Sequence, residues 1–116
     1  MRAIRTQLED LLHEIDTIRR FTSTGKIAFL ADDRTQYAVM MAYARIGEIT
    51  KQIPNEVLAA QPHIEWREIK GFRDVLLHRY FDISIERVWE AVEKLPTLRA
   101  ATESLLSDFP SEDEEG

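Results

Sequence analysis

Apolar residues recur at spacings of three and four along the first segment of the chain, and this periodicity constrains the fold most strongly. Such spacing places side chains on one face of an α-helix. The chain shows no alternation of apolar and polar residues of the kind that marks strands, and it has only four glycines and four prolines. We therefore expect an all-α protein. In the first helix, which ends near Phe21, the apolar face contains Ile4, Leu8, Leu11, Leu12, Ile15 and Ile18.

A second helix is predicted to begin after Asp32 or Asp33, either of which can cap it, and to end before Pro54. This helix is apolar nearly all round, so it must be covered on more than one side, either at the centre of a bundle or at a subunit interface. Its apolar side chains are Tyr37, Val39, Met40, Met41, Tyr43, Ala44, Ile46 and Ile53.

Two more long helices follow a short helical turn over residues 55–60. The third begins near Ile64 or Glu65 and contains Gly71, which costs about 1 kcal/mol relative to alanine in a helix interior and so suggests a close backbone approach. The fourth begins after Ser84, and Pro96 is expected to kink it. The apolar stripes are Trp66, Ile69, Phe72, Leu76 and Leu77 in the third helix, and Ile85, Val88, Trp89, Val92 and Leu95 in the fourth.

These segments predict an up-and-down bundle of four main helices with a kinked last helix, forming one domain over residues 1–107. Residues 108–116 are expected to be a disordered acidic tail. The formal charge is -6, but five acidic residues lie in this tail, at Asp108 and from Glu112 to Glu115. Without them, 15 basic and 16 acidic side chains remain, so the folded part is nearly neutral and can carry a local basic patch.

The composition also limits the chemistry. With no cysteine, disulfides, thiolate metal sites and cysteine nucleophiles are excluded. His13 and His63 have no partners at metal-ligand spacing. The amino terminus does not resemble a signal peptide and no run is apolar enough to span a membrane, so a cytoplasmic protein without a membrane partner is expected.

The segment from Arg73 to Tyr80, with the sequence RDVLLHRY, gathers three reactive groups. An arginine can hold a phosphate in a bidentate manner, and a histidine can transfer a proton near pH 7. Together they meet two requirements for cleaving a phosphodiester without a metal, and the phenol adds a potential nucleophile. The same residues also occur on ordinary solvent-facing helices, where cations near the carboxyl end interact well with the helix dipole.

Helical geometry separates these groups. Asp74 and His78 are four residues apart, so the carboxylate can orient the imidazole and favour its protonated form. Arg73 and Tyr80 share a face if the helix continues through Tyr80. Arg73 and His78 are about 140° apart round an ideal helix and cannot both face one phosphate. Either the helix frays before His78, or the cleft is formed by two copies of the segment across a two-fold axis. Candidate RNA-binding residues nearby are Arg67, Lys70 and Arg79.

The run from Arg73 to Tyr80 resembles the R-x-x-x-x-H-x-Y signature of the HepT-like proteins, the toxin half of HepT/MntA toxin–antitoxin pairs in the HEPN superfamily. The flanking segments RIGE at 45–48 and WREIKGF at 66–72 are also similar, as are the pairs Val88-Trp89 and Leu95-Pro96. The resemblance spans about residues 4 to 100.

This resemblance implies a homodimeric helical bundle that acts as a metal-independent endoribonuclease and needs no cofactor. Arg73 and His78 of both subunits would face a shared cleft, where the ribose 2′-hydroxyl attacks the adjacent phosphate. His78 would act as general acid or base, and Arg73 would stabilise the negative charge of the transition state. The family also implies a type VII antitoxin, a minimal nucleotidyltransferase similar to MntA, that transfers AMP onto Tyr80 and blocks the cleft.

Two alternatives remain open from the sequence. The chain could be a non-catalytic adaptor that binds a nucleotidyltransferase and helps to present its substrate, or simply a dimeric structural bundle. Many relatives carry asparagine after the motif arginine, whereas this chain has Asp74. Its charge would repel an RNA phosphate but could hold His78 protonated.

Overall fold

A computed structural model describes residues 3–110, apart from the side chain of Tyr80. No strand occurs among these residues, so the predicted all-α fold is confirmed. No helix in this part of the chain is long and apolar enough to cross a bilayer. The elements, in order, are α1 (Ile4–Phe21), α2 (Lys26–Leu30), α3 (Asp33–Gln52), α4 (Asn55–Leu58), α5 (Trp66–His78), the 3-10 turn η1 (Tyr80–Asp82), α6 (Ile85–Glu93) and α7 (Leu95–Ser107).

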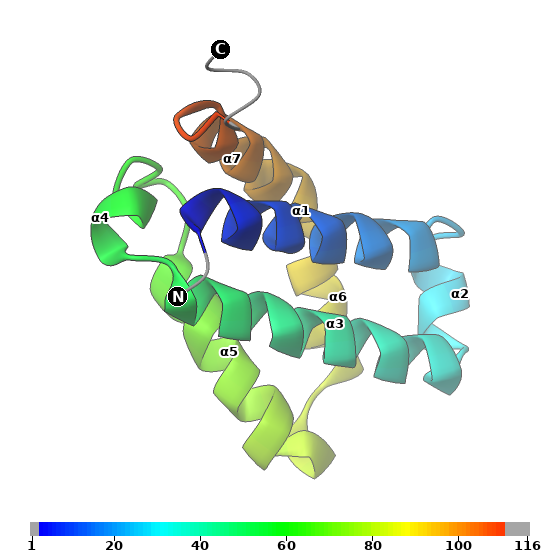
Figure 1. Cartoon of the computed structure of the whole chain (residues 1–116). Helices are drawn as coiled ribbons and strands as arrows, with labels where there is room; N and C mark the ends of the chain where they lie inside the picture. Colours follow the sequence, from blue (N-terminus) through cyan, green and yellow to red (C-terminus); the bar gives the residue numbers. More distant parts are fainter. Residues whose placement is uncertain (1–2, 111–116) are drawn as a thin grey trace.

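Helices α1 and α3 lie side by side as an antiparallel pair at the centre of the molecule, joined by α2 at one end (Figure 1). Their facing sides bury the residues that the spacing predicts, because positions three and four apart fall on one face. The buried carboxylate of Glu14 on α1 pairs with Arg45 on α3 at 3.1 Å, which gives the buried charge a partner. Fully buried side chains in this pair include Leu8, Leu11, Ile15, Ile18, Val39 and Ile46.

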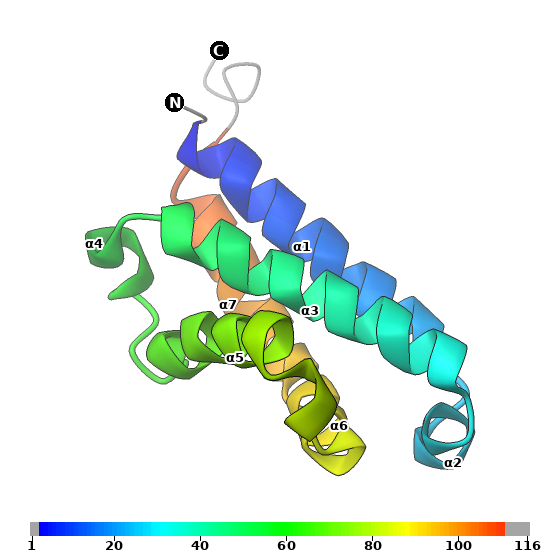
Figure 2. The ribbon, with the colours of Figure 1, turned by 90° about the horizontal axis from the view of Figure 1, so that it is seen from below.

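The remaining long helices cover this pair from different sides. Helix α5 packs against α3, crossing it, while α7 packs against α1 (Figure 2). Arg99 on α7 donates two hydrogen bonds to the carboxylate of Asp16 on α1, at 2.7 and 3.2 Å. At the far end of α7, Arg5 donates to the carbonyl of Phe109 at 2.7 Å. These hydrogen bonds connect α1 to α7 and to the segment that follows α7.

Asp32, one of the two residues predicted to cap this helix, caps α3. Its carboxylate accepts hydrogen bonds from the backbone N–H groups of Arg34 and Thr35 at 3.1 and 3.4 Å, and from the Thr35 hydroxyl at 2.7 Å. These bonds satisfy donors that have no partner inside the helix. They also lower the pKa of Asp32, chiefly through the Thr35 side chain.

The last helical region is interrupted rather than bent around the proline. Helix α6 ends at Glu93, Lys94 forms a turn, and α7 begins at Leu95 with Pro96 in its first turn. Proline is tolerated there because the first N–H groups of a helix have no acceptor within the helix. The predicted disturbance at Pro96 is thus present, but it separates two helices.

Two sequence-based expectations of the fold are wrong, and one short helix was missed. A side chain at Gly71 would meet nothing within 4 Å, so this glycine marks no close approach. Leu77, assigned to the buried stripe of the third helix, is 49% exposed. Helix α2 was not predicted, because five residues are too few to show a helical period. Its buried Phe29 packs against Trp89 with the ring centres 5.3 Å apart.

The predicted acidic tail falls partly outside the described residues, since 111–116 are not described. Helix α7 ends at Ser107, where the predicted domain ends. Phe109 remains half-buried against the core two residues later. The division at 107 and the disorder of the tail stay predictions.

Candidate active site on helix α5

Arg73 lies where α5 packs most closely against α3. A Cβ atom on Gly47 of α3 would overlap the Cβ of Arg73, and would lie 3.0 Å from its Cγ and 3.2 Å from the carbonyl oxygen of Ile69. Real Cβ contacts are longer than this, so only glycine fits at position 47 without displacing α5. The arginine side chain, 25% exposed, is thereby held against the surface of α3.

The guanidinium of Arg73 is held by two carboxylates. Its Nη2 lies 3.0 Å from Oε2 of Glu48 on α3, and its Nη1 donates to Oδ1 of Asp74 at 3.0 Å. Asp74 Oδ1 also accepts from Lys51 Nζ at 2.9 Å. Hydrogen bonds from Lys51 and then from Arg73 lower the pKa of Asp74, so its carboxylate is charged at neutral pH. The four side chains form an alternating network of charges that fixes the direction of Arg73.

One donor of Arg73 is left over. Its Nε is buried and has no hydrogen-bond partner among the described residues. A buried donor without a partner costs free energy, which a phosphate oxygen placed beside it would recover.

His78 is the last residue of α5 and is exposed. The helix continues up to this residue, so it does not fray before His78, and side chains five residues apart leave a regular helix about 140° apart. No hydrogen bond joins His78 to Asp74 in the described part of the chain, since Asp74 instead bonds Lys51 and Arg73. The predicted orienting contact between Asp74 and His78 is therefore not formed in this structure.

Helix α5 does not reach Tyr80. The helix ends at His78, Arg79 follows it, and Tyr80 begins the 3-10 turn η1, so Arg73 and Tyr80 do not lie on one continuous helical face. Only the backbone of Tyr80 is described. The predicted modification of this tyrosine therefore concerns a side chain that lies outside the description.

The three candidate RNA-binding residues are spread along α5. Arg67 in the first turn and Arg79 at the end of the helix are exposed, whereas Lys70 is half-buried. Lys70 Nζ donates to Oδ1 of Asn55, the first residue of α4, at 3.0 Å. Within residues 3–110, no group of three or more His, Asp or Glu side chains is arranged to hold a metal ion.

Large apolar side chains are exposed close to the motif in sequence and also on α3. Phe81 in η1 is 95% exposed, and Leu77, near the end of α5, is 49% exposed. On α3, Tyr37 and Met41 are also exposed, so one side of this apolar helix is uncovered, as the sequence allowed for a subunit interface. Exposed apolar residues grouped on one region of a surface commonly mark a binding interface.

Comparison with known proteins identifies the family. The family model described as "Ribonuclease HepT-like" matches residues 11–105, which include α5 and the segment from Arg73 to Tyr80. The chain belongs to the HepT-like ribonuclease family. A HepT-like protein of Thermococcus cleftensis, described as "Probable ribonuclease HepT", is 39% identical over 106 residues, covering 90% of this chain and 96% of its own.

Other HepT-like relatives cover the chain equally well. A protein of Methanocaldococcus jannaschii described as "Putative RNase MJ1216" is 33% identical over 115 residues, covering 97% of this chain and 95% of its own. No solved structure matches the chain significantly. The predicted membership of the HepT-like family is thus confirmed, and it supports a ribonuclease-like function.

Sequence reasoning did not assign roles to Gly47, Glu48 or Lys51, which position the motif. A glycine inside the long, apolar second helix was the available signal for Gly47. The sequence alone gives no means of pairing Glu48 and Lys51 with a segment more than 20 residues away, because that depends on how α3 and α5 cross.

Proposed function

We propose that this HepT-like protein is a metal-independent endoribonuclease whose cleft is formed by two copies of the chain. The observation that carries the proposal is the divergence of Arg73 and His78 on a regular α5. A second subunit related by a two-fold axis can bring its own His78 opposite Arg73, which one chain cannot do. The exposed Leu77 and Phe81, next to His78, supply apolar surface for such a contact.

The reaction follows from the chemistry of these two side chains. Neutral His78 takes the proton from a ribose 2′-hydroxyl, whose oxygen attacks the adjacent phosphorus. The bond between phosphorus and the 5′-oxygen of the next nucleotide breaks. That oxygen takes the proton now held by the imidazolium of His78, and a 2′,3′-cyclic phosphate remains. Arg73 stabilises the extra negative charge on the phosphoryl oxygens. DNA has no 2′-hydroxyl and is not cleaved.

The contacts of Arg73 give this mechanism an exchange step. A phosphate that binds Arg73 replaces Glu48 or Asp74 as the partner of the exposed part of the guanidinium. The exposed Arg67 and Arg79 flank the site and attract the RNA backbone.

We further propose that the protein is the toxin of a type VII toxin–antitoxin pair acting on cytoplasmic RNA. In this pair a minimal nucleotidyltransferase similar to MntA modifies Tyr80. The tyrosine oxygen attacks the α-phosphorus of ATP, releases pyrophosphate and carries AMP as a phosphodiester. Tyr80 lies two residues after His78, so the added anion would occupy the cleft and compete with RNA for its cations.

Cleavage assays on RNA and on DNA of the same sequence, with a chelator present, test the nuclease proposal. We expect the parent protein to cleave only RNA, and Arg73→Ala and His78→Ala each to lower the rate at least 100-fold. Cleavage by both variants at the parent rate would overturn the assignment.

For the modification, mass spectrometry after co-expression with the transferase should show an added AMP that is absent from Tyr80→Phe. AMP on another residue would refute it.

The second candidate function is a non-catalytic adaptor for a nucleotidyltransferase. The pairing of Arg73 with both Glu48 and Asp74 favours it, because two carboxylates lower the attraction of the guanidinium for an RNA phosphate. A purified protein that cleaves no RNA yet binds the transferase tightly would support this candidate over the nuclease.

A further inference from the structure

A cavity of about 680 Å³ lies between α5 on one side and α6 and α7 on the other. It uses the side of α5 that carries Glu68 and Phe72, whereas the charge network of Arg73 and Asp74 faces α3. Helix α5 packs on α3, and α6 packs on α2 and α7, so the space between α5 and α6 is not filled by a helix contact. Its volume falls within the range of small-molecule sites.

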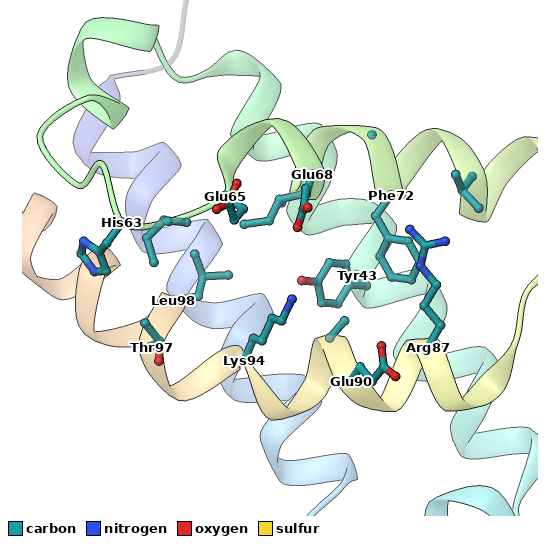
Figure 3. A pocket seen from close by; sticks show the side chains of 15 residues that line it. Tyr43, His63, Glu65, Glu68, Phe72, Arg87, Glu90, Lys94, Thr97 and Leu98 are labelled. Atoms are coloured by element: carbon teal, nitrogen blue, oxygen red, sulfur yellow. The ribbon is translucent and has the colours of Figure 1, made fainter.

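The inner end of this cavity is formed by Tyr43, which reaches it from α3. Only 5% of the tyrosine surface is exposed. Its ring packs edge-on against Phe72, with the ring centres 5.2 Å apart. Its hydroxyl has no hydrogen-bond partner among the described residues and points into the cavity (Figure 3). Burial, and then the nearby Glu68, raise the pKa of Tyr43 to about 12, so at neutral pH the hydroxyl can donate one hydrogen bond.

Two opposite charges converge on this hydroxyl. Figure 3 shows the ammonium of Lys94, from the turn between α6 and α7, and the carboxylate of Glu68, from α5, both directed into the cavity near Tyr43. Neither side chain forms an ion pair within the described part of the chain, although they face the same space. A second carboxylate, Glu65, lies beside Glu68 on the same wall.

The remaining lining between these charges is largely apolar. Ile64, Ile69 and Leu98 line the cavity between the carboxylate wall and Lys94. Arg87, at the other end, is engaged over the ring of Phe72, with its guanidinium carbon 5.7 Å from the ring centre. Lys94 therefore carries a positive charge opposite the carboxylates of Glu65 and Glu68, while the carboxylate of Glu90 lies beside Arg87 at the other end.

We propose that this cavity binds a small zwitterion, a molecule of amino-acid size with an amine at one end and a carboxylate at the other. The amine bonds Glu65 and Glu68, the carboxylate accepts from Lys94 and the Tyr43 hydroxyl, and the hydrocarbon between them covers Leu98 and Ile69. A cation alone would be repelled by Lys94, and an anion alone by the two glutamates. A ligand with both charges pairs Glu65 and Glu68 as well as Lys94 and the Tyr43 hydroxyl.

Calorimetric titration of the unmodified full chain with three six-carbon probes tests this proposal. The probes are 6-aminohexanoate, hexylamine and hexanoate, which share one hydrocarbon length and differ in charge. We expect 6-aminohexanoate to bind at least tenfold more tightly than either singly charged probe. Equal binding of all three, or no binding of 6-aminohexanoate at millimolar concentration, would overturn the proposal.

Variants locate the binding. Glu68→Gln and Lys94→Met, both at exposed positions, should each weaken 6-aminohexanoate binding at least tenfold without lowering the melting temperature. Glu93→Gln changes the same charge one residue before Lys94, does not line the cavity, and should leave binding unchanged. Binding that survives both Glu68→Gln and Lys94→Met would place the ligand elsewhere and refute the assignment. No RNA is present, so the result is independent of the proposed nuclease activity.

Discussion

Gly47 on α3 and Arg73 on α5 approach so closely that a side chain at position 47 would occupy the same space as the Cβ of Arg73. The contact places the arginine at the crossing of two helices, with Glu48 and Lys51 of α3 within reach of the guanidinium and of its neighbour Asp74. The position of the candidate catalytic arginine thus depends on Gly47, a residue without a side chain on the neighbouring helix.

Gly47→Ala should therefore disturb Arg73. Overlap with the Arg73 side chain forces α5 away from α3, and overpacking of this kind costs about 1–3 kcal/mol of stability. We expect a lower urea midpoint and at least a tenfold loss of RNA cleavage in the variant.

Gly71→Ala is the matched control, because the same substitution on α5 meets nothing within 4 Å. Replacing a helical glycine by alanine should raise stability by about 0.5–1 kcal/mol and leave cleavage unchanged. If both variants behaved alike, the Gly47 contact would not be what positions Arg73.

Asp74→Asn should strengthen RNA binding. Removing one negative charge 3.0 Å from the Arg73 guanidinium leaves the cation freer to pair with a phosphate, while an amide oxygen can still accept a hydrogen bond. We expect about a fivefold lower Kd for a 2′-O-methyl RNA, which cannot be cleaved, and a smaller difference at high salt. Glu93→Gln makes the same charge change on α6 and should have no effect; a Kd for Asp74→Asn equal to that of the parent would show that Asp74 does not limit phosphate binding.

Acid should weaken the link between α1 and α7. The hydrogen bond from Arg99 is the largest cause that lowers the pKa of Asp16 in the folded state. A lowered folded pKa stabilises the fold at pH values above the unfolded pKa of about 3.9, and the contribution disappears as pH falls through the lower folded pKa. Asp16→Asn should therefore be less stable than the parent at pH 7, with the difference closing below about pH 4.

Urea unfolding at pH 7 and at pH 3 measures this closure. Asp82→Asn, an exposed change in η1, serves as the control. A stability difference between Asp16→Asn and the parent that is the same at both pH values would exclude the ion pair as its cause.

The helices themselves are predictable because each local rule acts within a few residues. The periodicity of α1 and the cap at Asp32 depend only on neighbours along the chain. Pro96 likewise marks a disturbance, although the interruption falls at Lys94 because proline is accepted within a first helical turn.

Predictions from the sequence fail where the outcome depends on how two helices pack. Gly71 and Gly47 are equivalent as helical glycines in the sequence, yet only Gly47 lies at a crossing. Leu77 fits the apolar period of its helix but is 49% exposed, whereas its neighbour Leu76 is 5% exposed, so the buried face of α5 turns away from Leu77. For the same reason the spacing of Asp74 and His78 permits a contact that Lys51, from another helix, takes instead.

Phe81→Glu tests the proposed dimer contact. A charge on this 95% exposed ring should oppose association near His78 without affecting the folding of one chain. We expect a monomer in sedimentation experiments, an unchanged helical circular dichroism spectrum and a loss of RNA cleavage. Ile27→Glu, at an 87% exposed position on α2, is the matched control and should remain dimeric and active. A Phe81→Glu protein that stays dimeric would remove η1 from the interface.

Mixing two inactive variants tests whether the cleft is shared between subunits. If each site joins Arg73 of one chain to His78 of the other, a dimer of one Arg73→Ala chain and one His78→Ala chain contains one site with both residues and one site with neither. Co-purified with different tags, such mixed dimers should recover roughly half of the parent activity, while each variant alone stays inactive. If each chain cleaves with its own Arg73 and His78, every site in the mixed dimer lacks one residue, and no activity should return. The regular course of α5 from Arg73 to His78 favours the first result, because about 140° separates the two side chains on one helix.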